Sequence, residues 1–247
     1  MDETMGVPPA SITMMMFRLL ACVTLTLAAM VSAQSLKDFR TPRPLPRGDT
    51  LVIGFLGGWD EWDDARRGVR QTALLVGALP RTHAETASNH KRKRAIELIR
   101  ESFDFNRNGR LDADERRDAR VILYGQSMGG AAAVLTARDL KKLGMPVLLT
   151  VQVDSVGSRD SVIPDNVAAA ANFYQRESWP LVGQKTIRAA DPRKTRILGN
   201  YEYFYKDTKV VFLTEPWRAL GGSHAKMEQD PELWGRVMEL ILDAAHH

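Results

Sequence analysis

One serine in the chain stands where it could act as a nucleophile. Ser127 is the centre of Gly125-Gln126-Ser127-Met128-Gly129, a G-x-S-x-G pattern. The apolar residues 121–124 before it predict a short buried strand, and the small and apolar residues after it predict a helix. A serine in a sharp turn between strand and helix is the context in which this pattern indicates catalysis. An ordinary Gly-rich turn is the alternative.

A serine hydroxyl attacks a carbonyl group only when a neighbouring base takes its proton. His224 lies in Gly221-Gly222-Ser223-His224, between the last strand candidate and the last predicted helix. Loops at strand ends are where such sheets carry catalytic side chains, so His224 is the expected base. The remaining histidines are expected to be structural, solvated or terminal: His83, His90, His246 and His247.

An acid is needed to orient the histidine. Asp154 directly follows the apolar residues 147–153, which predict a buried strand. A carboxylate there could accept a hydrogen bond from the imidazole and hold its tautomer. The alternatives are that Asp154 only caps a turn, or that another acid serves: Asp160, Asp165, Asp191 or Asp207.

The elements that must position these residues alternate between strands and helices. Strands are predicted for residues 50–55, 82–88, 121–124, 147–153, 195–205 and 209–213. Helices are predicted from Asp63 or Asp64 to residue 76, for 91–103, from the Ser127 turn to Gly144, for 166–174, and from Pro231 onward with Asp230 as N-cap. This alternation predicts an α/β fold with a mostly parallel sheet flanked by helices.

The chain order Ser127, Asp154, His224, together with the Ser127 turn, resembles the α/β-hydrolase superfamily in its lipase and esterase-like branch. Gly125-Gln126-Ser127-Met128-Gly129-Gly130 is similar to the G-H-S-M-G-G turn of that family, with Gln126 in place of the usual His. The similarity covers about residues 50–245, and only the turn is specific. It implies a three-layer sandwich and hydrolysis of a small-molecule ester, thioester or lipid. In many members the acid follows a later strand than the one after the helix behind the nucleophile. Lipases that use the earlier strand, as expected here for Asp154, are also known.

The resemblance also implies an oxyanion hole of two backbone N–H groups. One is expected from Met128, and the other from Gly57 or Gly58 in the loop after the first strand. Glycines let bare amides approach the developing negative charge, where aimed donors stabilise it. The usual His-Gly pair is Gly-Gly here, and a simple turn is the alternative.

A second motif occupies residues 104–115 and fits D-x-[DN]-x-[DN]-G-x₅-E at every fixed position. It resembles an EF-hand loop, which implies bound Ca²⁺ with a structural role before the Ser127 strand. The expected ligands are Asp104, Asn106, Asn108, the Arg110 carbonyl, Asp112 and Glu115. Only residues 112–119 are left for the second helix, and no partner loop is present. A metal-free turn is the alternative.

Composition sets limits on the function. The chain has 247 residues, of which 44% are hydrophobic and 26% charged, which suits one globular domain with a sizeable core. The formal net charge of +4 is small and spread along the chain, so no nucleic-acid partner is expected. The basic run at 90–94 opens an amphipathic helix, where such charges usually form a solvated face.

Residues 1–33 are interpreted as a signal peptide, with cleavage after Ala33. The apolar run is too short and too polar at its end for a stable membrane span. Cys22, the only cysteine, lies within it, and a lipoprotein signal is the alternative. Cleavage leaves a chain without disulfides, with an extended lead-in at 34–49 and a hydrolase domain at 50–247.

The sequence therefore predicts an exported serine hydrolase, periplasmic or secreted, with a Ser127, His224 and Asp154 triad and a calcium loop. The competing hypothesis is an exported calcium-binding or interaction protein that uses the same scaffold without catalysis.

Overall fold

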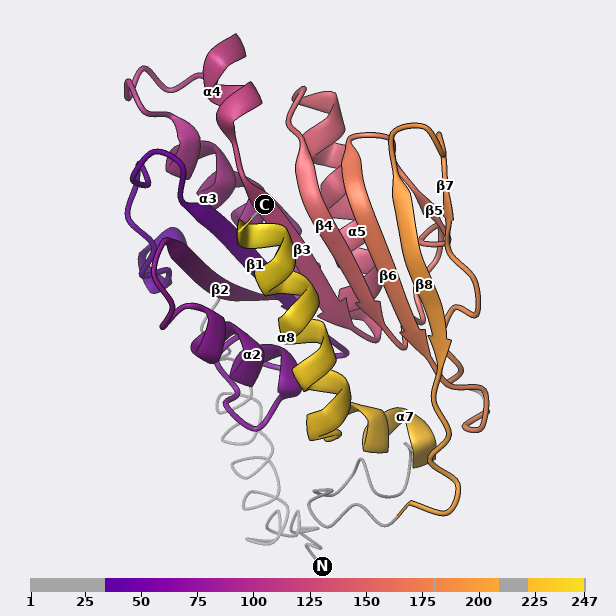
Figure 1. The fold of residues 1–247 in the computed structure, drawn as a ribbon. Helices are drawn as coiled ribbons and strands as arrows, with labels where there is room; N and C mark the ends of the chain where they lie inside the picture. Colours follow the sequence, from indigo (N-terminus) through magenta and orange to yellow (C-terminus); the bar gives the residue numbers. More distant parts are fainter. Residues whose placement is uncertain (1–33, 180, 209–221, 247) are drawn as a thin grey trace, which may run out of the picture. The chain divides into compact units, whose positions relative to one another are not determined.

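The computed structural model describes residues 34–179, 181–208 and 222–246. A six-stranded sheet has the order β2-β1-β3-β4-β6-β8, and every neighbouring pair is parallel (Figure 1). Its strands are β1 (Thr50–Leu56), β2 (Thr82–Ser88), β3 (Val121–Gln126), β4 (Val147–Val153), β6 (Val167–Tyr174) and β8 (Arg196–Glu202). Two short strands, β5 (Val162–Ile163) and β7 (Arg188–Ala189), pair separately.

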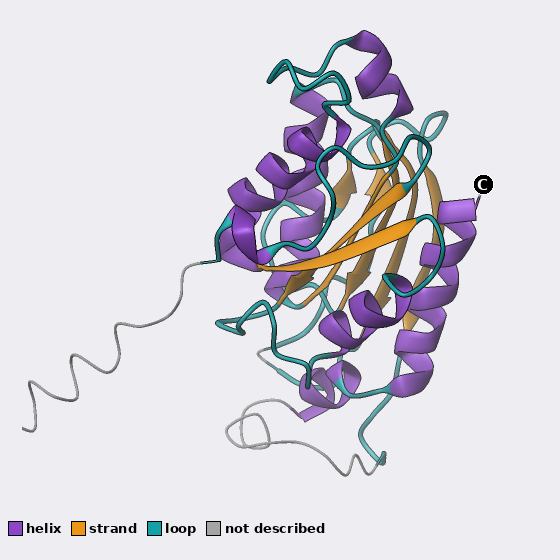
Figure 2. Ribbon diagram, turned by 90° about the vertical axis from the view of Figure 1, so that its left-hand side faces the viewer, coloured by secondary structure: helices purple, strands orange, loops and turns teal. Residues whose placement is uncertain are grey.

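Helices cover both faces of the sheet (Figure 2). One face packs against α2 (Gly68–Val76) and α8 (Pro231–His246), and the other against α3 (Arg92–Phe103) and α5 (Met128–Lys142). The remaining described helices are α4 (Ala113–Asp118), α7 (Gly222–Glu228) and the 3-10 turns η1 (Leu36–Asp38) and η2 (Asn89–Lys91). The predicted fold class, α/β with a mostly parallel sheet flanked by helices, is confirmed.

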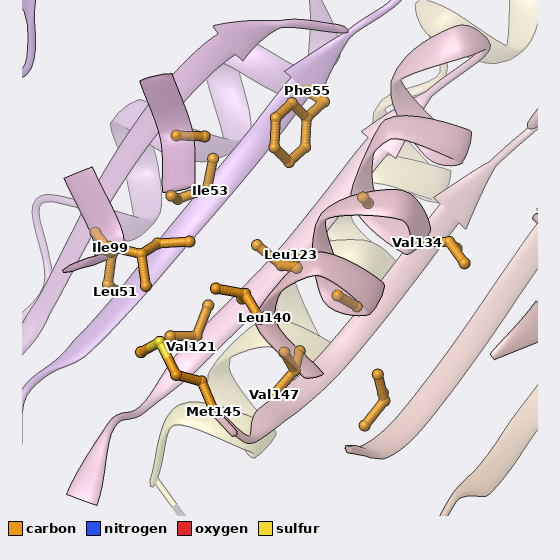
Figure 3. Packing of buried hydrophobic residues seen from close by; sticks show 14 of the residues in the cluster. Leu51, Ile53, Phe55, Ile99, Val121, Leu123, Val134, Leu140, Met145 and Val147 are labelled. Atoms are coloured by element: carbon orange, nitrogen blue, oxygen red, sulfur yellow. The ribbon is translucent and has the colours of Figure 1, made fainter. Parts of the chain in front are cut away.

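Alternating side chains explain why the central strands are apolar throughout. Val121 and Leu123 pack in the core under α3 and α5, which Figure 3 shows from close by. Ile122 and Tyr124, the residues between them, pack in the core under α2 and α8. A strand that buries both faces needs apolar residues at consecutive positions, so the run before Ser127 follows from its place in the sheet.

Residues 166–174 were predicted as a helix, and this prediction is wrong because 167–174 form strand β6. The segment Val-Ala-Ala-Ala-Ala-Asn-Phe-Tyr has a high intrinsic helix propensity from its alanines. It lacks the charged face that a helix on the protein surface needs. Ala170 and Ala171 are fully buried between β4 and β8, so burial within the sheet outweighs the local preference.

The start of α2 also differs from the prediction. Neither Asp63 nor Asp64 caps the helix, which begins at Gly68. The Asp64 carboxylate instead accepts a hydrogen bond of 3.1 Å from the Arg66 N–H in a preceding turn. The Gly68 N–H donates to Glu228 Oε1 at 2.9 Å, so the first turn is satisfied by a residue far along the chain.

Other element predictions agree closely with the structure. The strands at 82–88 and 147–153 have the predicted bounds. Asp230 caps α8, since its Oδ1 accepts from the N–H groups of Glu232 at 2.9 Å and Leu233 at 3.3 Å. The strand candidate at 209–213 lies outside the described residues.

The lead-in at 34–49 lies against the sheet edge. Gln34 Nε2 donates to the Thr86 carbonyl at 2.7 Å, and Glu85 Oε1 accepts from the N–H groups of Arg40 and Thr41 at 2.6 and 2.7 Å. Both acceptors belong to β2, so this segment continues the packed unit. The signal-peptide prediction for 1–33 lies outside the described residues. Within those residues, none of the helices combines the length and apolarity needed to cross a membrane.

Candidate active site

Ser127 occupies the single position between β3 and α5. Its backbone has φ 57° and ψ −126°, a conformation that costs energy for any residue with a side chain. A Cβ at Gly129 would lie 1.9 Å from the Phe55 carbonyl oxygen, and one at Gly125 would lie 2.4 Å from the Gly129 backbone. Both glycines of the pattern are therefore required by the close approach of β1, β3 and α5 at this turn.

Asp154 and His224 form a direct pair. The Asp154 Oδ2 and His224 Nδ1 atoms are 2.6 Å apart, and both residues are buried. Gln175 also holds the carboxylate, because its N–H donates to Oδ1 at 3.0 Å and its side-chain amide donates to Oδ2 at 2.8 Å. Two donors of Gln175 thus fix the orientation of the carboxylate toward the imidazole. A Cβ at Gly183 would be 2.0 Å from Asp154 Oδ1, so a second loop closes over the acid.

His224 lies in helix α7, and its predicted placement in a loop is wrong. The segment around it carries two glycines and a serine, which resembles a loop in sequence. The start of α7 is held from outside: Ser178 Oγ accepts from the His224 N–H at 3.3 Å, and Ser223 Oγ donates to Glu177 Oε2 at 2.8 Å. Contacts with the loop after β6 therefore fix the histidine backbone.

Ser127 and His224 line one pocket, together with the predicted oxyanion residues Gly57 and Gly58. The structure thus brings Ser127, His224 and Asp154 together from β3, α7 and β4, at the carboxyl ends of the strands. The His224 Nε2 atom faces the side-chain amide nitrogen of Gln126 at 3.3 Å.

The predicted oxyanion donors lie next to the serine. A Cβ at Gly57 would be 2.8 Å from Ser127 Cβ, so only a glycine fits there. Asn89 Nδ2 donates to the carbonyls of Leu56 at 3.1 Å and Gly58 at 2.6 Å, which holds this loop in place. Met128 is the first residue of α5, and the first N–H groups of a helix lack partners within it.

The same pocket carries charges that the sequence prediction missed. Asp60, Arg67, Gln229 and Glu228 line it, and Arg67 Nη2 bonds Asp60 Oδ1 at 2.7 Å. Burial raises the pKa of Asp60 above its usual value, against the lowering effect of Arg67. Burial likewise raises the pKa of Glu228 to about 8. Glu228 follows His224 by four residues. This spacing places both side chains on one face only if the segment is a helix, so it indicates a shared site only once α7 is known.

The competing acids and histidines make other contacts. Asp160 accepts from Ser155 Oγ, and Asp165 pairs with Lys194 at 3.3 Å. Asp191 pairs with Arg193 at 3.0 Å. His83 Nε2 bonds Asp49 Oδ2 at 2.9 Å at the outer strand β2. Among the residues that could orient His224, Asp154 is the carboxylate in contact with it.

The loop at 104–115 is folded around its acidic side chains. Asp104 accepts from the N–H groups of Asn108 at 3.1 Å and Gly109 at 2.8 Å. Glu115 accepts from those of Asn106 at 3.1 Å and Asp112 at 3.0 Å. The following helix α4 has six residues, as short as predicted.

The donor set of this loop consists of oxygens, the ligand type that calcium takes, so its residues fit that ion. Asp104, Asn106, Asn108, the Arg110 carbonyl, Asp112 and Glu115 would hold it. Over the described ranges, no three His, Cys, Asp or Glu side chains converge as a metal-binding group. Two of the six expected ligands are asparagines and one is a backbone carbonyl.

No protein-family model matches the chain. No curated protein matches its sequence. Among solved structures, a cutinase-like protein from Cryptococcus sp. is similar over 80% of this chain and 95% of its own, with 11% sequence identity and a TM-score of 0.45. A dienelactone hydrolase from Anabaena variabilis is similar over 82% of this chain and 88% of its own, with 13% identity and a TM-score of 0.40. Both similarities are distant and concern the fold alone.

Proposed function

We propose that the protein is a serine hydrolase that cleaves carboxylic esters or thioesters. The observation that carries this proposal is the 2.6 Å contact between Asp154 and His224, which lines the same pocket as Ser127 in its strained turn. Backbone strain that the surrounding packing maintains is typical of functional positions. The three residue types are those that activate a hydroxyl for acyl transfer.

In this mechanism Ser127 Oγ attacks the carbonyl carbon while His224 Nε2 takes its proton. The carbonyl electron pair moves to the oxygen, where the N–H groups of Met128 and of Gly57 or Gly58 stabilise the negative charge. The tetrahedral species then expels the alcohol or thiol, which receives the proton from the imidazolium. Water, deprotonated by His224, then attacks the acyl-enzyme, and the imidazolium returns the proton to Ser127 Oγ as the bond to the acid breaks. Asp154 accepts the hydrogen bond from His224 Nδ1 and holds the imidazole tautomer throughout.

The pocket lining supports small, polar substrates. Its described residues are mostly polar or charged, and the others are Gly57, Gly58 and Ala225. A long acyl chain needs apolar side chains around it, because binding in such sites derives from apolar burial. We therefore favour esters of short acids over lipids as substrates.

Replacement of the nucleophile tests the proposal. Ser127→Ala is expected to lower kcat for p-nitrophenyl butyrate by at least about 10³-fold, because no group replaces the attacking oxygen. A fluorophosphonate probe should label the wild-type chain at Ser127. Ser102→Ala is the matched control, since Ser102 is also buried but lies in α3. Wild-type turnover in the Ser127→Ala variant, or labelling elsewhere, contradicts the proposal and favours a non-catalytic binding role.

We also propose that the 104–115 loop binds Ca²⁺ as a structural ion. The oxygen donor set and the complete motif support this. Bound calcium would brace the connection from α3 through α4 to β3, which carries Ser127 at its end. Export to the periplasm or the medium remains a proposal from the composition of residues 1–33.

A further inference from the structure

Glu228 is a buried carboxyl group in the wall of the active-site pocket. It is 5% exposed and lines the pocket with Ser127 and His224. Because it follows His224 by four residues in α7, the two side chains share one face of that helix. Trp234 Nε1 donates to the Glu228 carbonyl at 2.8 Å, which fixes the end of α7 against α8. The backbone of Glu228 is therefore fixed at the pocket that Ser127 and His224 also line.

Burial is the main effect that opposes ionisation of Glu228, and the charges that face it act in both directions. Asp60, Asp64 and Arg67 face it from the loop between β1 and α2, and His224 stands on its own helix. Arg67 already bonds Asp60 at 2.7 Å and Asp64 at 3.5 Å. An ionised Glu228 would thus compete with these carboxylates for the same guanidinium. Burial, with the charges of Asp60 and Asp64, raises the pKa of Glu228 to about 8, although Arg67 and the Gly68 N–H lower it.

The neutral acid has one oxygen already engaged. Glu228 Oε1 accepts from the Gly68 N–H at 2.9 Å, so the proton of the neutral acid belongs on Oε2. A carboxylic acid in a pocket can donate this proton to a ligand oxygen, whereas a carboxylate can only accept. Buried polar groups that contact a substrate discriminate strongly against analogues that lack the matching atom.

We propose that Glu228 is a specificity-determining residue whose neutral carboxyl group donates a hydrogen bond to an ether, hydroxyl or carbonyl oxygen next to the scissile ester. This inference rests on the proposed function and names its substrate class as oxygen-bearing short esters. Ionisation removes the donor and adds a negative charge to the wall of the pocket. Preference for such esters is accordingly present below about pH 8 and lost above it.

Two pairs of esters of equal length test the proposal. The acyl pair is p-nitrophenyl methoxyacetate against p-nitrophenyl butyrate, and the alcohol pair is 2-methoxyethyl acetate against butyl acetate. The measured quantity is the ratio of kcat/KM within each pair, divided by the same ratio for uncatalysed hydrolysis at that pH. The wild-type ratio should favour the methoxy ester in at least one pair at pH 6.5 and fall about tenfold by pH 9.

Variants separate the proposed role of Glu228 in specificity from its hydrogen bond to the Gly68 N–H at the start of α2. Glu228→Gln keeps an acceptor for the Gly68 N–H and a donor at every pH, so its preference should persist at pH 9. Glu228→Leu should lack the preference at both pH values, and Glu232→Leu, at an exposed position of α8, is the matched control. If Glu228→Leu does not fold by circular dichroism, the pH dependence of wild type against Glu228→Gln decides alone.

The outcomes also distinguish this inference from the proposed function. Hydrolysis of both members of each pair without the preference, or a preference that does not change with pH, overturns the role of Glu228 and leaves the hydrolase standing. Absence of hydrolysis of all four esters by the wild-type chain overturns both.

Discussion

The side-chain amide nitrogen of Gln126 lies 3.3 Å from Nε2 of His224. On the other side of the ring, Nδ1 faces the Asp154 carboxylate and must carry the proton, so Nε2 holds the lone pair and the Gln126 amide donates to it. This lone pair is the one that takes the Ser127 proton in the proposed mechanism. In that mechanism the Gln126 amide therefore holds the Nε2 lone pair of His224 in the resting site, and this hydrogen bond must break before Ser127 attacks.

Removal of this donor should make the serine more reactive. Gln126→Met keeps the side-chain length without the amide, and we expect fluorophosphonate labelling of Ser127 to become about three- to tenfold faster, because one hydrogen bond no longer competes for Nε2. Gln229→Met is the matched control, since Gln229 lines the same pocket but donates to the Arg66 carbonyl at 3.3 Å. An unchanged or slower labelling rate in Gln126→Met, with the fold intact, contradicts this role.

Loss of the carboxylate at position 154 should leave the serine without an oriented base. Asp154→Asn is expected to lower kcat on the order of 10³- to 10⁴-fold, because an amide cannot hold the imidazole tautomer or stabilise the imidazolium. Steady-state kinetics with p-nitrophenyl butyrate measures this. Asp191→Asn provides the comparison, since Asp191 pairs with Arg193 at the surface and should keep its activity. Equal effects of the two changes would argue against Asp154 as the acid.

Glu228 should make the folded chain less stable as the pH rises. Its pKa is raised from 4.5 in the unfolded chain to about 8 in the folded chain, so the folded state binds this proton more tightly. The stabilisation is complete below about pH 4.5 and is lost as the pH rises to about 8. Glu228→Gln should therefore match wild type near pH 4.5 and exceed it at pH 9, on the order of a few kcal/mol.

Urea unfolding at both pH values measures this difference. Glu232→Gln, at an exposed position, should show no pH-dependent gain. A constant difference between Glu228→Gln and wild type across the pH range would show that Glu228 ionises normally in the folded chain.

Calcium should stabilise the chain through the 104–115 loop. We expect the Tm in millimolar Ca²⁺ to exceed that in EGTA by a few degrees, since an ion that binds only the folded state stabilises it by mass action. Glu115→Gln should remove the difference, because Glu115 supplies two of the expected ligand oxygens. Glu101→Gln, outside the motif in α3, should retain it. Identical Tm values for the wild-type chain in both solutions would rule out a structural ion at this site.

Local sterics explain which parts of the site were predictable. Gly125, Ser127 and Gly129 are dictated by contacts within one turn, so the sequence pattern indicates them directly. Asp154 could be predicted because a residue that follows a buried strand lies at the edge of the sheet where such sites form. The order of strands and helices could also be predicted, because most elements have a clear periodicity of apolar residues.

Long-range contacts determine the features that could not be predicted from the sequence. The alanines of β6 favour a helix locally, and only their position between two strands makes them extended. Helix α7 depends on Ser178 and Glu177 from a distant loop, so the sequence around His224 resembles a loop. The contact of Glu228 with Gly68 joins residues that no local pattern connects.

The close approach of Gly183 to Asp154 has a consequence for how the site tolerates change. A single added carbon at position 183 would meet both the Oδ1 atom and the Cα atom of Asp154, at 2.0 and 2.8 Å. Either the loop must lift or the acid must turn, and both admit water to a carboxylate that is now fully buried. A methyl group at position 183, which is remote in sequence from Ser127 and His224, would thus displace Asp154. In the proposed mechanism this would disable His224 as the base, because Asp154 orients it.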